Sequence, residues 1–213
     1  MSSSGQRGFT LVEVVVMMSV LTLGILGTLA VANYAVQAGS RNEQQATAVN
    51  LAREGVELVR SIRDSNWSAM AEETGPRCWD YYPDTEEEAG QPPPGSCNPR
   101  FQDLSAATNF TAYLNVGNGS PYLVQQASGS TSAAAYRLCQ DGRGLYVPKT
   151  APCGSGQRTY YRRVTIRRVN DLGIDVDDGK RKYSILVQSR VTWPKRGASD
   201  VIVEEYLTDW RKF

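Results

Sequence analysis

Residues Arg7–Val16 read RGFTLVEVVV, and they open a long apolar segment. One carboxylate, Glu13, stands near the start of this segment, and no residue from Val14 to Val36 is charged. An apolar run of this length is enough to cross a bilayer, because roughly 20 helical residues span about 30 Å of hydrocarbon. The single acid in such a run therefore needs a physical explanation.

Two ordinary kinds of N-terminal segment leave Glu13 unexplained. A secretory signal has an apolar run of about 7–15 residues and then a small-residue cleavage site, whereas this run is longer and offers only loose alanine candidates. An uncleaved signal anchor fits the length, with Arg7 held on the cytoplasmic side. A carboxylate costs about 2.5–3.5 kcal/mol at the centre of a spanning helix and less near an end, so such residues usually have a partner.

A cut between Gly8 and Phe9 would supply that partner. The new α-amino group of Phe9 would be a cation at neutral pH, and Glu13 would lie about one helical turn from it. In an assembly of parallel helices, the ammonium group of one subunit could meet the carboxylate of its neighbour. Because an unpaired charge in hydrocarbon is costly, this pairing would favour one axial stagger over the others.

The segment GFTLVE, Gly8–Glu13, follows a short polar leader that ends in a basic residue and glycine. It resembles the N-terminal signal of type IV pilins and pseudopilins. The resemblance implies that a prepilin peptidase of the membrane cuts after Gly8 and methylates the new N-terminal Phe9. It also implies that Glu13 is needed for entry of the subunit into a filament. Leu51–Trp67 and the closing YLTDWR are similar to segments of a subset of minor pilin-like proteins.

The bulk composition excludes several classes of function. The chain has 213 residues, a net charge of +1 and no histidine, so no global field selects nucleic acid or an anionic surface. The missing histidine excludes Ser-His-Asp and Cys-His catalysis and every His-containing metal site. Since no serine or lysine motif replaces them, we expect no enzyme activity, no cofactor and no metal.

The chain has four cysteines, and none of them forms a CxxC pair, which argues against zinc. An even number of cysteines behind a membrane segment is typical of two disulfides in an exported domain. Three pairings of Cys78, Cys97, Cys139 and Cys153 are possible. The local pairing, Cys78–Cys97 with Cys139–Cys153, closes short loops and is the one we favour.

The helical pattern continues beyond the apolar run. The stretch from Arg41 to Asp64 has no proline, and apolar residues recur at helical spacing on one face: Val49, Ala52, Val56, Val59 and Ile62. We predict one helix from about Phe9 to Arg63, about 80 Å long. Gly24 and Gly27 in its first half are open to three readings: local loosening on assembly, close helix–helix approach, or the ordinary frequency of glycine in membrane helices.

The predicted organisation has four parts. A leader (1–8) is followed by a transmembrane or filament-core half of the helix (9–36), an amphipathic half (37–63) and an exported globular domain (64–213). The first half of the helix suits lipid or a filament core, and the second half suits packing on a soluble domain.

The exported domain is predicted to end in a β-sheet. Residues 64–157 read mostly as loop, with short strands at 110–116 and 121–126. Three longer strands follow, of which the last two form an antiparallel hairpin: Arg158–Val169, Tyr183–Trp193 and Val201–Trp210. The predicted fold class is therefore α+β and pilin-like, with a long N-terminal helix packed on a C-terminal antiparallel sheet.

Two charged segments are candidates for ligand binding. A basic patch with interleaved tyrosines would suit a DNA backbone and stacked bases, and its arginines are Arg162, Arg163, Arg167 and Arg168. The alternative, which we favour, is a positive strand that faces the acidic segment 64–107 of the same or a neighbouring subunit. Asp175–Gly179, DVDDG, offers carboxylates suited to calcium but matches no EF-hand loop, so we predict a polar turn there.

Together these features predict a structural filament subunit, a minor pilin or pseudopilin of a type IV pilus or a type II secretion-like filament. Its partners would be the prepilin peptidase and methyltransferase, other pilin subunits and, before assembly, inner-membrane lipid. It would cross the membrane once with its C-terminal domain exported, and would end in a cell-surface or periplasmic filament. The alternative is a membrane-anchored binding or adhesin domain that never polymerises, and the N-terminal residue of the mature chain distinguishes the two.

Overall fold

The computed structural model describes residues 10–71, 78–101, 104, 107–114, 118–126, 133–170, 183–194 and 200–208. The chain divides into two compact units, Met1–Gln45 and Ala46–Phe213. The described residues form one long helix, a short 3₁₀ helix and seven strands, in the order α1 (Leu11–Ala71), β1 (Thr108–Leu114), β2 (Pro121–Gln125), η2 (Ala133–Tyr136), β3 (Arg137–Gln140), β4 (Tyr146–Pro148), β5 (Tyr160–Asn170), β6 (Tyr183–Thr192) and β7 (Asp200–Thr208).

Helix α1 is 61 residues long. No proline interrupts it, and its apolar stripe in the second unit keeps the helical period. It ends at Ala71, later than the predicted end near Arg63, because Asn66 and Trp67 of the last turns are buried against the rest of the second unit. Tertiary contacts thus extend the helix through a polar stretch where propensity alone is weak.

The strands form one antiparallel sheet in which β5 is the central strand. On one side β5 pairs with β6 along Tyr161–Asn170, and β7 pairs with β6. The other side of β5 is shared, since β1 pairs near Val164–Ile166 and β3 pairs at Tyr160–Tyr161. β2 then pairs with β1 and β4 with β3, so the sheet has two branches beyond β5.

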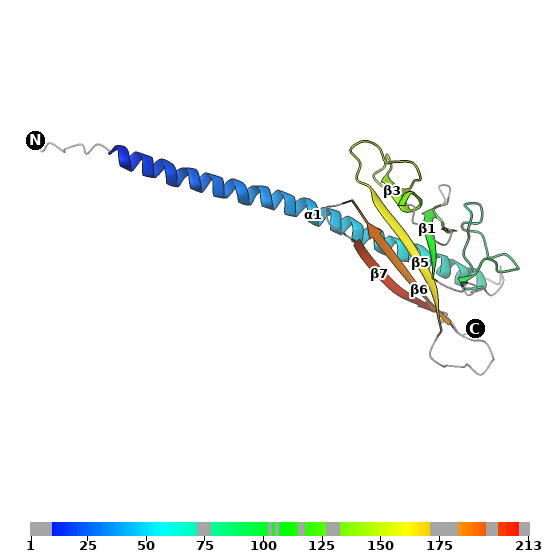
Figure 1. Cartoon of the computed structure of the whole chain (residues 1–213). Coiled ribbons are helices and arrows are strands. Elements are labelled where there is room, and N and C mark those ends of the chain that lie inside the picture. The colour runs from blue at the N-terminus through cyan, green and yellow to red at the C-terminus, as the bar shows by residue number, and fades with distance from the viewer. Residues whose placement is uncertain are drawn as a thin grey trace, which may run out of the picture. The chain divides into compact units, whose positions relative to one another are not determined.

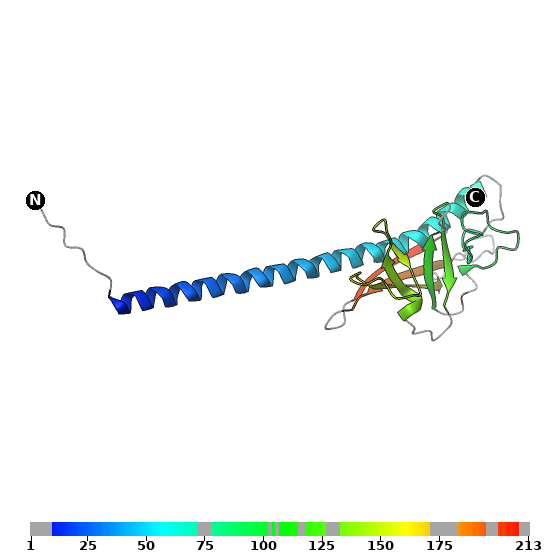
Figure 2. The ribbon, with the colours of Figure 1, turned by 90° about the horizontal axis from the view of Figure 1, so that it is seen from above.

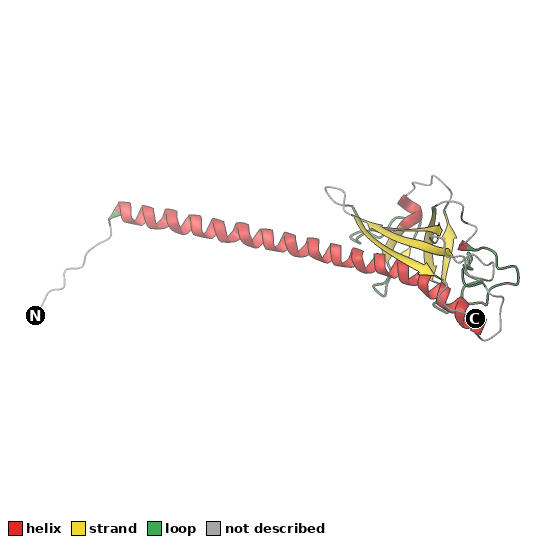
Figure 3. Ribbon diagram, turned by 90° about the horizontal axis from the view of Figure 1, so that it is seen from below, coloured by secondary structure: helices red, strands yellow, loops and turns green. Residues whose placement is uncertain are grey.

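In the second unit the sheet lies along the C-terminal part of α1, as Figures 1, 2 and 3 show from three directions. The helix contributes buried apolar residues at helical spacing, and the central strands contribute every second residue. The core residues of α1, β5 and β6 include Ala52, Val56, Val59, Ile62, Val164, Ile166, Ile185, Val187 and Val191. Each buried valine or isoleucine contributes about 1.5–3 kcal/mol by burial. The predicted α+β class, with a long helix packed on a C-terminal antiparallel sheet, is confirmed.

The segment 64–157, which we predicted to be mostly loop, contributes much of the core. Trp79, Tyr82 and Phe101 are buried, and the rings of Tyr82 and Phe101 stack with centroids 4.8 Å apart. It also contains β3 and β4, which the sequence analysis missed because strands of four and three residues are too short to show a periodic pattern. The two short strands predicted at 110–116 and 121–126 correspond to β1 and β2.

Candidate assembly site on the N-terminal helix

Helix α1 begins with an N-cap hydrogen bond between Thr10 and Glu13. The Oγ1 atom of Thr10 accepts a hydrogen bond from the backbone N–H of Glu13 at 3.3 Å, and the Thr10 carbonyl accepts one from Val14 at 3.2 Å. The spacing T-x-x-E is that of a capping box, in which an N-cap hydroxyl satisfies an otherwise unpaired N–H group of the first turn. A carboxylate there is also favoured by the partial positive charge of the helix N-terminus.

The carboxylate of Glu13 stands on an apolar, exposed surface. Its neighbours Leu11, Val12 and Val14 are all exposed, and within the described residues Glu13 makes no ion pair. Large apolar side chains remain exposed along α1 as far as Val36. A surface of this kind is stable in lipid or against other apolar helices, and its single charge then needs a partner from outside the described residues.

Three hydroxyl side chains in this apolar segment donate hydrogen bonds within the helix itself. The hydroxyls of Ser19, Thr22 and Thr28 donate to backbone carbonyls three or four residues earlier, at 2.8, 2.7 and 2.9 Å. Such back-bonding removes a donor that would otherwise lie unpaired in hydrocarbon. These three hydroxyls are therefore compatible with a lipid environment.

Gly24 and Gly27 do not interrupt α1, which is helical at both positions. A Cβ atom added at either position would meet no atom within 4 Å. No contact among the described residues therefore requires glycine there, which leaves close approach of another helix as a reading that the geometry permits. The best 18-residue window of α1 has a mean hydropathy of 2.4, so the helix is long and apolar enough to cross a membrane.

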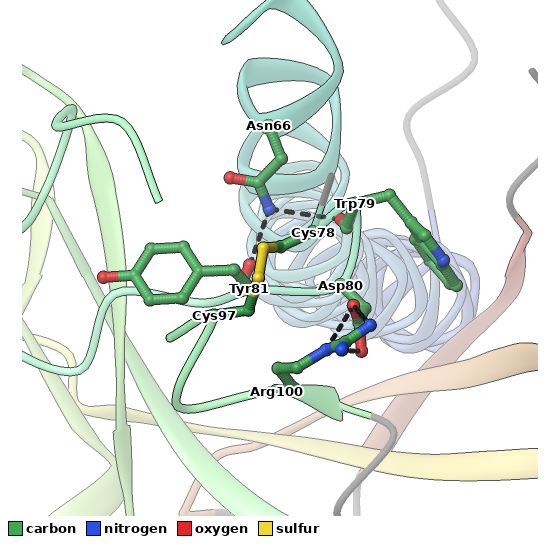
Figure 4. Close-up of a disulfide and its surroundings, with 7 residues drawn as sticks. All are labelled: Asn66, Cys78, Trp79, Asp80, Tyr81, Cys97 and Arg100. Atoms are coloured by element: carbon green, nitrogen blue, oxygen red, sulfur yellow. Dashed lines mark hydrogen bonds and ion pairs between the residues drawn. A yellow bond between two sulfur atoms is a disulfide. The ribbon is translucent and has the colours of Figure 1, made fainter. Parts of the chain in front are cut away.

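The cysteines are paired as Cys78–Cys97 and Cys139–Cys153, with Cα atoms 5.7 and 5.3 Å apart. This is the local pairing that we favoured among the three. Cys78–Cys97 closes a loop that is anchored on the end of α1 (Figure 4). The side-chain amide of Asn66 donates to the carbonyls of Trp79 and Tyr81 at 3.1 and 2.7 Å.

A buried ion pair completes this loop. Asp80 is fully buried and pairs with Arg100, whose Nη2 lies 2.7 Å from Oδ1 of Asp80 (Figure 4). Nearby, burial and the hydrogen bond to Glu88 raise the pKa of the Tyr81 phenol, which donates to Glu88 at 2.9 Å. These buried and paired groups give the disulfide loop a fixed position on α1.

Two ion pairs join α1 to the sheet within the second unit. Arg162 of β5 lies 3.0 Å from Glu54, and Arg60 lies 2.5 Å from Glu205 of β7. The hydrogen bond to Glu205 is the main cause that raises the pKa of Arg60. These two ion pairs fix the position of the helix along the sheet.

The predicted basic patch does not form as one surface. Arg162 is 3% exposed and faces the core with Val164 and Ile166, because residues two apart in a strand share a face. Its partner is Glu54 of α1 and not the acidic segment 64–107. Arg163 is half-buried, while Arg167 and Arg168 are exposed near the end of β5. Burial therefore takes Arg162 out of the possible DNA-binding patch, while DNA binding by the other three arginines stays an untested prediction.

Several predicted site residues lie outside the described residues, namely Gly8, Phe9 and the segment Asp175–Gly179. Within the described residues, no three His, Cys, Asp or Glu side chains gather as a metal site requires. Sequence reasoning missed Asn66, because nothing in the local pattern shows that the loop after α1 folds back onto its last turns.

One comparison with known proteins identifies the N-terminus. A family model described as the prokaryotic N-terminal methylation motif matches residues 3–29. No curated protein matches the chain, and no solved structure matches it. The motif implies processing by a prepilin peptidase and assembly with other pilin subunits, and it points to a structural, non-enzymatic role. The apolar part of α1 indicates membrane anchoring. This motif stands at the head of a long apolar helix whose C-terminal part packs on an antiparallel sheet, and together these are features of a type IV pilin-like protein.

Proposed function

We propose that this chain is a minor pilin or pseudopilin, a non-catalytic subunit of a type IV pilus or a type II secretion-like filament. It is cut between Gly8 and Phe9, methylated on Phe9 and assembled through the apolar part of α1. The observation that carries the proposal is the exposed Glu13 carboxylate, which has no ion-pair partner among the described residues and stands on an apolar helix surface inside the methylation motif.

The assembly step follows from the chemistry of a charge in hydrocarbon. Cleavage turns the backbone nitrogen of Phe9 into an amine that is cationic at neutral pH, methylated or not. The N-cap hydrogen bond to Thr10 keeps Glu13 in the first turn of α1, close to the new terminus. When parallel helices pack, the amine of one subunit meets Glu13 of its neighbour, and any other stagger leaves two charges unpaired.

The uncharged apolar segment and the two disulfides support insertion of the subunit into the inner membrane before it joins a filament. The apolar segment carries no charge between Val14 and Val36, whereas the second unit contains both disulfides. Disulfides persist in oxidising compartments, so the second unit lies on the exported side. The subunit waits in the membrane as a single-pass protein until it joins a filament.

The first test is the identity of the mature N-terminus. Mass spectrometry of the N-terminal peptide from native membranes should find N-methylated Phe9. An intact Met1, or a Sec-type cut near residues 30–36, would contradict the filament proposal and favour the membrane-anchored adhesin instead.

The second test is the substitution Glu13→Val. We expect unchanged membrane insertion, because an apolar side chain replaces the only charge of the segment, but a loss of at least about tenfold in filament incorporation because the pairing with the neighbouring amine is absent. Incorporation is measured by immunoblotting of sheared filaments against membranes. Glu13→Asp is the matched control, since it keeps the charge and should retain part of the incorporation. Incorporation of Glu13→Val at the level of the unchanged chain would remove the charge pairing from the proposal.

A further inference from the structure

The outer face of the sheet, opposite α1, brings two arginines together. Strands β5 and β6 lie side by side (Figure 1), and Arg163 of β5 and Arg190 of β6 are direct cross-strand partners in their register. Like charges directly opposite on a sheet are destabilising. Among the described residues the ion pair of Arg190 is a long one, with its Nε atom 3.8 Å from Asp200, and Arg163 makes none. The pair therefore carries more positive charge than its surroundings neutralise.

These arginines line a surface cavity of about 460 Å³. Its other walls are mainly aromatic, and Tyr136, Tyr161 and Trp193 all contribute to them. No acidic side chain is among the described residues that line it. A cavity with this volume and lining matches ordinary small-molecule sites, which combine apolar walls with a few polar groups.

Four of the residues that line the cavity have a polar side-chain atom without a hydrogen-bond partner. Tyr136 Oη, Arg163 Nε, Arg190 Nε and Trp193 Nε1 are all buried, and none of them has a hydrogen-bond partner among the described residues; Arg190 Nε has only the long ion pair with Asp200. Tyr136 as a whole is only 6% exposed. A buried donor without an acceptor is unfavourable, so four around one cavity indicate a missing acceptor.

The fold holds Tyr136 in place over this face. The 3₁₀ helix η2 ends at Tyr136 and continues directly into β3, which pairs with β5. The Thr111 hydroxyl of β1 donates to the carbonyl of Ala135 at 2.9 Å. Burial raises the pKa of the Tyr136 phenol, with the charge of Arg163 opposing it, so the hydroxyl stays protonated and can donate.

We propose that this cavity binds an oxyanion, a carboxylate or a phosphate, carried by a ligand with a flat ring. The arginines supply charge-assisted hydrogen bonds from Nε, a geometry that suits the two oxygens of such a group. Tyr136 and Trp193 donate to the remaining lone pairs, and the faces of Tyr161 and Trp193 accept the ring. This binding site is additional to filament assembly and does not depend on it.

The test uses the full chain in detergent micelles and three probes that share one ring. Benzoate carries a carboxylate, phenyl phosphate carries a phosphate, and benzamide is the neutral isostere of benzoate. Binding is followed by NMR through the indole N–H of Trp193 and the Nε–H signals of the two arginines. We expect saturable shifts with at least one anion and none with benzamide. The anion that binds more tightly identifies the oxyanion of the ligand.

Variants of the cavity localise the site. Arg163→Gln and Arg190→Gln should each weaken binding by about tenfold, because each removes a charge-assisted hydrogen bond. Tyr136→Phe removes only a hydroxyl and should weaken binding by about threefold. Arg167→Gln is the matched control, since this arginine lies on the same strand and is exposed, and it should leave binding unchanged.

Two results would overturn the proposal. One is the absence of saturable binding by both anions in the correctly folded chain. The other is equal weakening by Arg167→Gln and Arg163→Gln, which would indicate nonspecific attraction to positive charge. A thermal unfolding measurement without any probe shows whether the variant is folded. In this measurement Arg163→Gln should raise the midpoint of thermal unfolding, since it relieves the repulsion with Arg190. A lowered midpoint would mean that the two charges are already neutralised and that the cavity lacks the excess charge proposed here.

Discussion

Gly55 of α1 packs tightly against the sheet. A Cβ atom added there would lie 3.1 Å from Cδ of Arg162 and 3.2 Å from Cβ of Ser189, and closer still to the Ser189 hydroxyl. Two effects compete at this position. Alanine in place of glycine stabilises a helix interior by about 1 kcal/mol, while overpacking a tight core costs about 1–3 kcal/mol.

We expect overpacking to prevail in Gly55→Ala, with a free energy of unfolding lowered by about 1 kcal/mol. The shift is measured by thermal or urea unfolding followed by circular dichroism. Gly39→Ala is the control, because a Cβ there would meet nothing within 4 Å, and it should not destabilise. A stabilised Gly55→Ala protein would mean that the helix does not lie this close to β6.

Asp141 organises the turn between β3 and β4 through its carboxylate. Its Oδ1 atom accepts hydrogen bonds from the N–H groups of Arg143 and Leu145 at 2.8 and 2.9 Å. The bond from Leu145 is the main cause that lowers the pKa of Asp141, and the bond from Arg143 adds to it. A lowered pKa in the folded chain means that the stabilisation is complete above the unfolded pKa, about 3.9, and is lost as the pH falls through the folded value.

We therefore expect the amide signals of Arg143 and Leu145 to titrate together in NMR, with a midpoint below about 3.9. Asp141→Asn keeps an acceptor oxygen but has no charge, so this titration should disappear while the turn persists near neutral pH. A midpoint above that of an unperturbed aspartate would contradict the hydrogen-bonded carboxylate.

Helix α1 contacts β5 through an ion pair whose two partners differ in burial. The side chain of Arg162 is 2% exposed and that of Glu54 is 39% exposed. Arg162 also donates to the carbonyls of Leu51 and Ala112 at 3.4 Å. Removal of one partner is therefore not equivalent to removal of the other.

We expect Glu54→Ala to cost about 3 kcal/mol, because it leaves a buried guanidinium without its counter-charge. Arg162→Met should cost less than about 1.5 kcal/mol, since methionine fills similar space and Glu54 stays in contact with water. Chemical denaturation of both variants and of the double variant gives the comparison. Equal costs, or a larger cost for Arg162→Met, would contradict the burial difference.

At the scale of the whole molecule, the core and the proposed assembly surface belong to different units. Every buried core residue, from Ala48 onward, lies within Ala46–Phe213. The long run of exposed apolar side chains, Leu11–Val36, lies in Met1–Gln45. Folding and insertion into lipid or a filament therefore draw on separate sets of residues.

We expect a chain that lacks residues 1–45 to stay monomeric without detergent and to unfold in one transition within a few degrees of the full chain. Calorimetry and size exclusion with light scattering measure both properties, with the full chain in micelles as the reference. Aggregation or loss of the transition in the shortened chain would mean that its core depends on the first unit.

The local sequence determined those features that depend on residue type and periodicity alone. The uncharged run from Val14 to Val36, the helical spacing from Val49 to Ile62 and the alternation in β6 predicted the long helix, its two environments and the sheet, because periodicity reports which face is buried. The motif at the N-terminus likewise needs no tertiary contact. Only the tertiary structure decided which arginines of β5 are buried, that Gly55 packs closely on Arg162 and Ser189, and that η2 places Tyr136 beside Arg163 and Arg190. Those outcomes depend on strand register and on contacts between residues far apart in the chain, which no local pattern encodes.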